Sequence, residues 1–123
     1  MRQFKRSDRL RSQILRDVQV MLEHECTARL QGMVTFTDVE ISADLKYATI
    51  FYSVLGDDEA KQRASAYLTR IRKRVQSELG ALLRLKKTPE IRFEFDPSIE
   101  RGMRIEQILN ELSRKDEHND ENK

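Results

Sequence analysis

Two stretches of β-type patterning stand next to each other in the first half of the chain. The first alternates between apolar and polar residues from Met33 to Ser42, and the second runs from Leu45 to Leu55. Only Ala43-Asp44 lies between them. A connection this short predicts two antiparallel strands joined by a two-residue hairpin turn.

The hairpin carries two further signals. The apolar parity of the first strand switches between Phe36 and Val39, which predicts a β-bulge or a local twist near Thr37-Asp38. The second strand is largely apolar on both faces, with Tyr47, Thr49, Phe51 and Ser53 on one and Ala48, Ile50, Tyr52 and Val54 on the other. This favours a central strand, although either face could meet the core. Its aromatic residues are more typical of a core than of a platform for stacking RNA bases.

Helical spacing of apolar residues flanks the hairpin on both sides. Upstream, Ser7 can cap a helix that we expect to reach about Cys26, followed by a connector from Thr27 to Gln31. Downstream, Asp57-Asp58-Glu59 begins an amphipathic helix with acids first, as the helix dipole favours. Its apolar stripe consists of Ala60, Ala64, Tyr67, Leu68, Ile71, Val75, Leu79 and Leu82.

The last third of the chain predicts one more strand, a short helix and a tail. Thr88-Pro89 ends the second helix, and the strand from Glu90 to Asp96 alternates with Ile91, Phe93 and Phe95 pointing inward. Asp96-Pro97 is a helix-start signal for a shorter apolar-periodic segment. From Lys115 to Lys123 no residue is apolar, so we expect this charged tail to be disordered.

The order of elements is therefore α-β-β-α-β with an extra C-terminal helix. This predicts a single α+β domain whose three-stranded sheet is covered on one face by helices. The connectivity resembles that of the bacterial, type II KH domain. A KH domain grips single-stranded RNA with a GxxG loop, and no GxxG occurs in this sequence. We divide the chain into a basic arm (1–6), the KH-like domain (7–114) and the tail (115–123).

Composition narrows the class of protein. The 123 residues suffice for one domain with a modest core, and the single cysteine can form no internal disulfide, so we expect a cytoplasmic protein. No segment has the apolar run of a signal peptide or of a membrane-spanning helix, so no membrane partner is expected.

Charge is unevenly distributed although the net charge is only +2. Residues 61–87 carry nine Lys or Arg against one acid, Glu78, whereas residues 38–59 carry six acids against one base, Lys46. A basic segment of this size suits a polyanion, most simply a nucleic acid, although it could also be an ordinary solvated helix surface.

Catalytic chemistry finds little support in the sequence. His24 and Cys26 are two residues apart on a helix, point in different directions and cannot share a metal. No phosphate-binding glycine loop and no Ser/His/Asp set is present. The acids at 57–59 could bind Mg²⁺, but acids at a helix start are more typical of capping. We therefore predict a binding protein that is not an enzyme and has no cofactor or metal.

Four blocks of sequence carry a resemblance to the ribosome-binding factor A family, which is a family of bacterial small-subunit assembly factors. The resemblance extends over about Arg9 to Leu112, and the combination of blocks is specific. The blocks are Gly32–Leu45 (GMVTFTDVEISADL), Tyr52–Gly56 (YSVLG) with Ala48 before it, Ser77–Gly80 (SELG) with Leu83–Phe93 (LRLKKTPEIRF), and Asp96–Ile105 (DPSIERGMRI).

This resemblance implies a KH-like fold without GxxG and a role in ribosome biogenesis and rRNA processing. The expected partners are the small (30S) ribosomal subunit and its 16S rRNA during late maturation, with release when assembly finishes, and an assembly GTPase is a further candidate. No dimer interface is evident, so we expect a monomer. In the family a small-X-Gly kink bends the long helix, whereas Ile71-Arg72-Lys73 occupies those positions here. The helix therefore bends elsewhere or runs straight from about Asp58 to Leu79.

Candidate RNA-binding residues follow from the basic segments, because the planar fork of Arg can bond two phosphate oxygens at once. We expect the long helix and the loop after it to line one side together with the basic arm. The candidates are Arg70, Arg72, Lys73, Arg74, Arg84, Lys86 and Lys87, with Arg2, Lys5 and Arg6 of the arm and Arg101 and Arg104 beside Gly102. An alternative hypothesis is a protein-interaction module that docks a partner at the hairpin edge or at Asp57–Glu59, so that the basic face is incidental.

Overall fold

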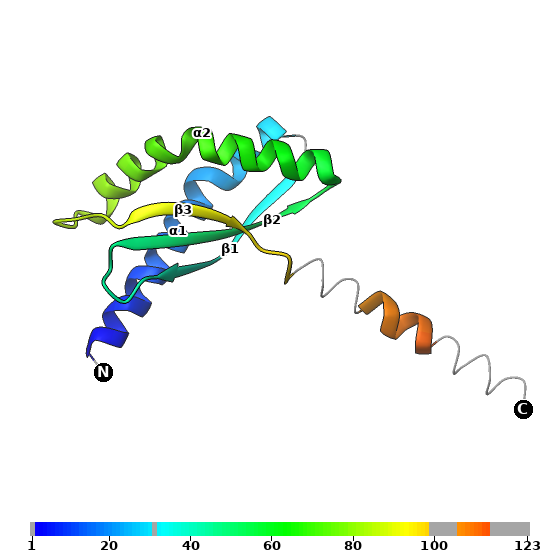
Figure 1. Cartoon of the computed structure of the whole chain (residues 1–123), viewed down its shortest axis with the longest axis horizontal. Coiled ribbons are helices and arrows are strands. Elements are labelled where there is room, and N and C mark those ends of the chain that lie inside the picture. The colour runs from blue at the N-terminus through cyan, green and yellow to red at the C-terminus, as the bar shows by residue number, and fades with distance from the viewer. Residues whose placement is uncertain (1, 31, 99–105, 114–123) are drawn as a thin grey trace, which may run out of the picture.

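The computed structural model describes residues 2–30, 32–98 and 106–113. Helix α1 (Arg2–Leu30) comes first, then strands β1 (Met33–Ile41) and β2 (Tyr47–Leu55), helix α2 (Asp58–Leu83) and strand β3 (Glu90–Phe95). Residues 106–113 are also helical, and their apolar side chains Ile108, Leu109 and Leu112 are exposed. Both long helices pack against the same face of the sheet (Figure 1). The predicted α+β, KH-like order of elements is confirmed.

The sheet has the strand order β1-β2-β3. β1 pairs with β2 antiparallel, and the register shifts between Phe36 and Asp38, where the bulge was predicted. β3 pairs with β2 in parallel, because α2 crosses over the sheet between them. β2 is thus the central strand, as both of its apolar faces predicted.

One contiguous core lies between the sheet and the two helices. The face of β2 that meets it is the one with Ala48, Ile50, Tyr52 and Val54, which answers the question that the sequence left open. The T-shaped contact between Tyr52 and Phe95, with ring centroids 5.9 Å apart, closes one end. The fully buried side chains of α1 and α2 include Ile14, Val18, Leu22, Leu68, Val75 and Leu79.

Helix α1 extends beyond the predicted bounds of Ser7 and Cys26 at both ends. It begins at Arg2, so the backbone of residues 2–6 is helical and does not form a separate arm. Arg, Gln and Lys are good helix formers, and no breaker separates them from the apolar stripe. At the other end Leu30 is buried four residues after Cys26, so it prolongs the core-facing stripe.

The hairpin connection is longer than the two residues predicted. The strands stop at Ile41 and resume at Tyr47, and Leu45 has a φ of 60°. The Asp44 carboxylate accepts hydrogen bonds from the Ser42 hydroxyl and the Lys46 backbone N–H, at 2.6 and 3.0 Å. These local side-chain bonds replace part of the strand ladder and open the turn.

Helix α2 runs without interruption from Asp58 to Leu83 through the positions of the family's kink. The Asp57 side chain caps its start by accepting a 2.8 Å hydrogen bond from the Ala60 N–H. At its end Arg84 adopts a left-handed conformation, with φ 52°, and its N–H bonds to the Gly80 carbonyl. Within the described ranges no helix is long and apolar enough to cross a membrane. The predicted tail from residue 115 lies outside them.

Candidate nucleic-acid interface

The basic residues in the middle of α2 do not share one side of the helix, contrary to the expectation from the sequence. Each residue turns the helix by about a quarter of a circle, so consecutive residues face different neighbours. Arg70 and Arg74, four residues apart, lie on the side of α2 that faces α1. Arg72 lies on the side that faces β3, and Lys73 is exposed.

Arg72 is used to hold α2 against the outer edge of the sheet. Its guanidinium donates a 3.4 Å hydrogen bond to the Ile91 carbonyl and lies 3.8 Å from the Glu90 carboxylate. One turn later the Gln76 amide donates to the Pro89 carbonyl at 2.7 Å and accepts from the Ile91 N–H at 2.6 Å. The side chains of Arg72 and Gln76 thus bond to backbone groups at the free edge of β3. The nearby Glu90 carboxylate partly neutralises the charge of Arg72.

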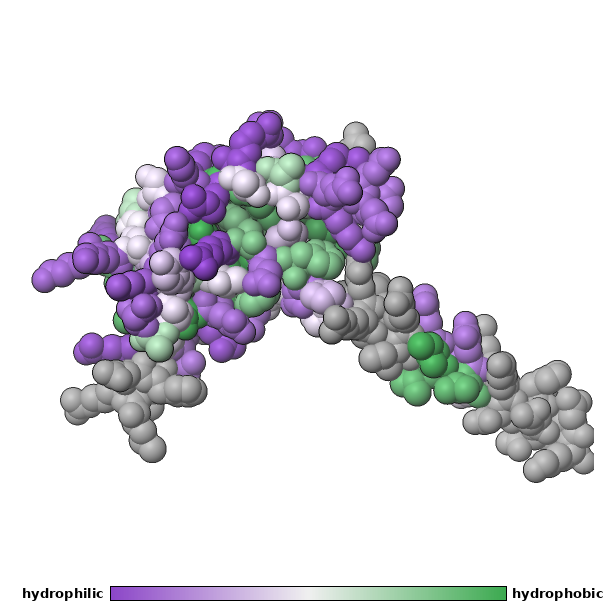
Figure 2. All heavy atoms as spheres, viewed as in Figure 1, coloured by the Kyte–Doolittle hydropathy of each residue, from purple (hydrophilic) through white to green (hydrophobic). Residues whose placement is uncertain are grey.

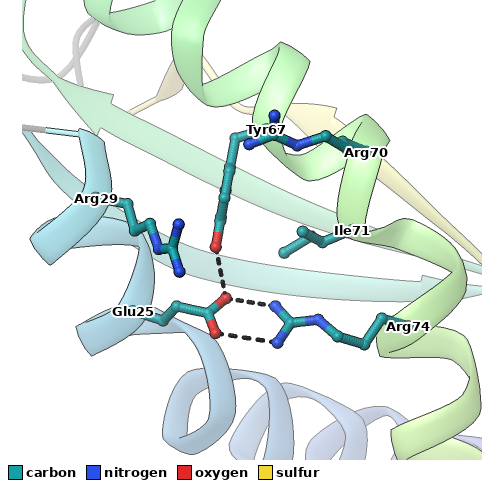
Figure 3. A pocket seen from close by; sticks show the side chains of 6 residues that line it. All are labelled: Glu25, Arg29, Tyr67, Arg70, Ile71 and Arg74. Carbon is teal, nitrogen blue, oxygen red and sulfur yellow. Dashed lines mark hydrogen bonds and ion pairs between the residues drawn. The ribbon is translucent and has the colours of Figure 1, made fainter.

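Arg74 is bound to a carboxylate of α1 (Figure 3). Its two terminal nitrogens donate to the two oxygens of Glu25 at 2.6 and 3.2 Å, and the Tyr67 hydroxyl donates to the same carboxylate at 2.8 Å. The hydrogen bonds from Arg74 lower the pKa of Glu25 against the opposing effect of burial. Burial, followed by the bond to Glu25, raises the pKa of Tyr67.

A shallow groove runs between the C-terminal end of α1 and the middle of α2, and we call it the arginine groove. Two adjacent hollows form it, and both are lined by Arg29, Tyr67 and Arg70. One continues to Glu25, Ile71 and Arg74, and the other to Leu30, Arg63 and Ala66. Figure 3 shows Arg29 and Arg70 on opposite sides of the Tyr67 ring, and the Arg70 guanidinium lies 5.5 Å from the ring centroid.

Arg29 and Arg63 were not among the residues proposed from the sequence. A signal for Arg29 existed, since it lies four residues after Glu25 and shares its helix face if the helix continues to Leu30. The predicted helix end at Cys26 hid that relation. Arg63 was counted in the basic segment but was not proposed as an RNA ligand. In the structure it makes a 3.8 Å ion pair with Glu59, four residues before it on the same helix.

The loop between α2 and β3 presents a second group of cations. Arg84, Lys86 and Lys87 are exposed, and their side chains make no ion pair or hydrogen bond with other described residues. Leu82 and Leu85 beside them are exposed apolar side chains. Figure 2 shows hydrophilic side chains projecting at the end of the molecule where α2 passes into β3.

The remaining candidates are placed less closely. Arg6 is exposed in the first turns of α1, and Arg2 and Lys5 belong to the same helix by their backbone. Arg101 and Arg104 lie outside the described residues.

Other chemistry-bearing groups sit apart from this surface. Burial raises the pKa of the Cys26 thiol to about 11, so the side chain stays a neutral member of the core. His24 is exposed. In the part of the chain that the structure describes, no three His, Cys, Asp or Glu side chains are grouped so that they could hold a metal ion.

Comparison with known proteins agrees with the sequence blocks. A family model described as ribosome-binding factor A matches residues 6–109. This chain is similar to the crystal structure of ribosome-binding factor A from Thermus thermophilus, with a TM-score of 0.60. The alignment covers 72% of this chain and 93% of the Thermus thermophilus chain. At 20% identity this second match shows the fold alone.

A solution NMR structure from Thermotoga maritima, of a protein provisionally described as a ribosome binding factor A, is 32% identical. It covers 72% of this chain and 85% of its own, with a TM-score of 0.56. The family match extends over most of the 123 residues, including α1, the hairpin, the whole of α2 and β3. The chain belongs to the ribosome-binding factor A family.

Proposed function

We propose that this protein is a non-catalytic assembly factor that binds the small (30S) ribosomal subunit through its 16S rRNA during late maturation and dissociates when assembly is complete. The family match over residues 6–109 is the observation that carries the proposal. The protein acts as a monomer in the cytoplasm, and an assembly GTPase is a candidate cooperating partner.

The exposed cations supply a physical means of binding. Phosphate contacts by Lys and Arg fix the position of a protein on RNA but read no sequence, so specificity would come from the shape of folded rRNA. If about six phosphates are neutralised, affinity should fall roughly a thousandfold between 50 and 200 mM salt. The cations of the α2–β3 loop are exposed, and their side chains make no ion pair or hydrogen bond with other described residues.

Co-sedimentation of the purified protein with mature and with precursor-rich small subunits, across a salt series, tests the proposal. We expect salt-sensitive binding that favours precursor-rich subunits. A folded protein that ignores small subunits even at low salt would overturn it, and family membership would then describe only the fold.

Variants separate RNA contact from the alternative of a protein partner. Reversing the charges of residues 72–74 is a poor test, because it would place carboxylates against Glu90 and Glu25. Lys86→Gln with Lys87→Gln avoids this, and Arg9→Gln with Arg16→Gln, at exposed positions of α1, is the matched control.

Loss of two phosphate contacts should lower the salt dependence (the slope of log affinity against log salt) by about 1.5, and the control should change little. Unchanged subunit binding by the loop variant, together with loss on replacing Asp58 and Glu59, would instead favour docking of a protein at the acidic end.

A further inference from the structure

We propose that the arginine groove is a phosphate-binding site, in which Arg29 and Arg70, on the two sides of the Tyr67 ring, each bind a backbone phosphate of one rRNA strand. The inference deepens the proposed function and rests on it. The proposal places the RNA contact of α2 on the side of the helix that faces α1, and it adds Arg29 and Arg63 to the interface.

The charge of the groove is the first argument. Four arginines line it, and Glu25 is its one lining carboxylate. Both oxygens of Glu25 already accept bonds from Arg74, and one also accepts from Tyr67. Neither Arg29 nor Arg70 makes a hydrogen bond or a short ion pair with a described carboxylate, although the charge of Arg29 also acts on Glu25 and helps to lower its pKa. With four arginines against one carboxylate the groove keeps an excess of positive charge, which phosphates bound beside Arg29 and Arg70 would offset.

The rigidity of the groove is the second argument. Tyr67 is buried in the core cluster, and its hydroxyl is fixed by Glu25, which Arg74 holds in turn. The ring therefore forms a fixed wall, and the Arg70 guanidinium lies over it at 5.5 Å from the centroid. A binding site in which the wall and one of the cations are already positioned loses less conformational entropy when the ligand arrives.

The shape of the groove favours a phosphate of a nucleic acid strand over an acidic peptide. The apolar lining residues Leu30 and Ile71 are only 7% and 9% exposed, so they offer little apolar surface to the anchoring side chain that peptide sites usually need. Guanidinium forks match the non-bridging oxygens of a phosphodiester. Both hollows are open to solvent and together extend from Arg74 to Arg63, so a strand can lie along them.

The test uses the full chain with Arg29→Gln and Arg70→Gln, and the Arg9→Gln, Arg16→Gln protein as control. Neither arginine has a short ion pair to lose, and the exposed contact of Arg70 with the Tyr67 ring is weak, so the thermal midpoint should stay within about 4 °C of the wild type. In co-sedimentation with small subunits the salt slope should fall by about 1.5, and affinity at 50 mM salt should drop about tenfold or more. Arg29→Lys with Arg70→Lys should keep the slope but bind more weakly, because lysine lacks the fork.

The outcomes separate this proposal from the function on which it rests. Wild-type protein that does not bind subunits overturns both. Wild-type binding that the double replacement leaves unchanged overturns the groove alone. An NMR titration of the arginine Nε–Hε signals with millimolar inorganic phosphate distinguishes the source of the anion. If free phosphate saturates these signals and the Gln variants bind subunits as the wild type does, the groove is a site for free phosphate and the proposal of an RNA site is overturned. If the Gln variant unfolds, the Lys variant tests the groove through affinity, because weaker binding at an unchanged slope is expected and unchanged affinity would overturn the groove.

Discussion

Glu25 decides which arginines of the groove are available for a ligand. Its carboxylate binds Arg74 through both oxygens and orders Tyr67, whereas Arg29 and Arg70 make no hydrogen bond with it. The pair is half-exposed, so its strength comes from the bidentate geometry and from the third bond to the hydroxyl.

Glu25→Gln should lower the free energy of unfolding by about 1 kcal/mol at pH 7, because the charge-assisted bonds to Arg74 weaken. Since Arg74 lowers the pKa of Glu25 in the folded state, the unfolded chain binds its proton more readily. The stabilisation is therefore complete above the unfolded pKa of about 4.3 and disappears as the pH falls through the lower folded value. Urea unfolding of both proteins from pH 7 down to pH 3 measures this.

Glu40→Gln serves as the control, because Glu40 is exposed on β1 and makes no side-chain bond with other described residues. If wild type and Glu25→Gln differ in the free energy of unfolding by the same amount at pH 3 as at pH 7, packing and not the ionised pair is responsible for the difference.

The limit of the sequence at this scale is visible in Arg72 and Arg74. Both were predicted as RNA ligands from the density of positive charge, yet one bonds β3 and the other bonds Glu25. Glu25 and Arg74 are 49 residues apart in the chain, so only the packing of α1 on α2 shows that they meet.

Helix α2 determines how the basic segment is displayed. The family's small-X-Gly kink has no counterpart in Ile71-Arg72-Lys73, and the helix is continuous there. Ile71 is buried in the core and Arg72 is bonded to β3, so these two side chains fix the helix to the core and to the edge of the sheet at this point. Lys73 is exposed and can report the backbone conformation without disturbing packing.

Lys73→Gly should unfold with about 1 kcal/mol less free energy than Lys73→Ala, because glycine loses more backbone entropy than alanine inside a helix. Equilibrium urea unfolding of the two variants gives the difference directly, and both lack the lysine charge, so electrostatics cancel. Equal stabilities would show that residue 73 is not in regular helix.

Element boundaries were predictable where a period was explicit. The parity switch between Phe36 and Val39 located the bulge, and the doubly apolar second strand identified the centre of the sheet. The turn was mispredicted because Leu45, a residue that disfavours positive φ, adopts it under the constraint of the Ser42–Asp44 hydrogen bonds. Hydrogen bonds of this local kind do not produce a periodic pattern of apolar residues, so the sequence pattern could not predict them.

On the scale of the whole molecule, the described core closes before the C-terminal segment. Its buried residues run from Ile14 to Ile91, and Phe95 is the last side chain packed on it. Asp96 secures the end of β3, since its N–H bonds to the Tyr52 carbonyl at 2.7 Å and its carboxylate accepts from the Thr37 hydroxyl at 2.8 Å. Ser98 adds a backbone bond to the same carboxylate.

A chain that ends after Ser98 should therefore keep its free energy of unfolding within about 1 kcal/mol of the full chain. A chain that ends after Glu94 loses the Phe95–Tyr52 contact and the Asp96 bonds, and should lose about 3 kcal/mol. Urea unfolding of the three proteins measures both effects. The chain that ends after Ser98 lacks Arg101 and Arg104 together with Arg114, Lys115 and Lys123, so it tests these C-terminal cations as a group. A truncate that is folded and sediments with small subunits at an unchanged salt slope would remove Arg101 and Arg104 from the interface, whereas an unfolded one would show that residues beyond 98 complete the core.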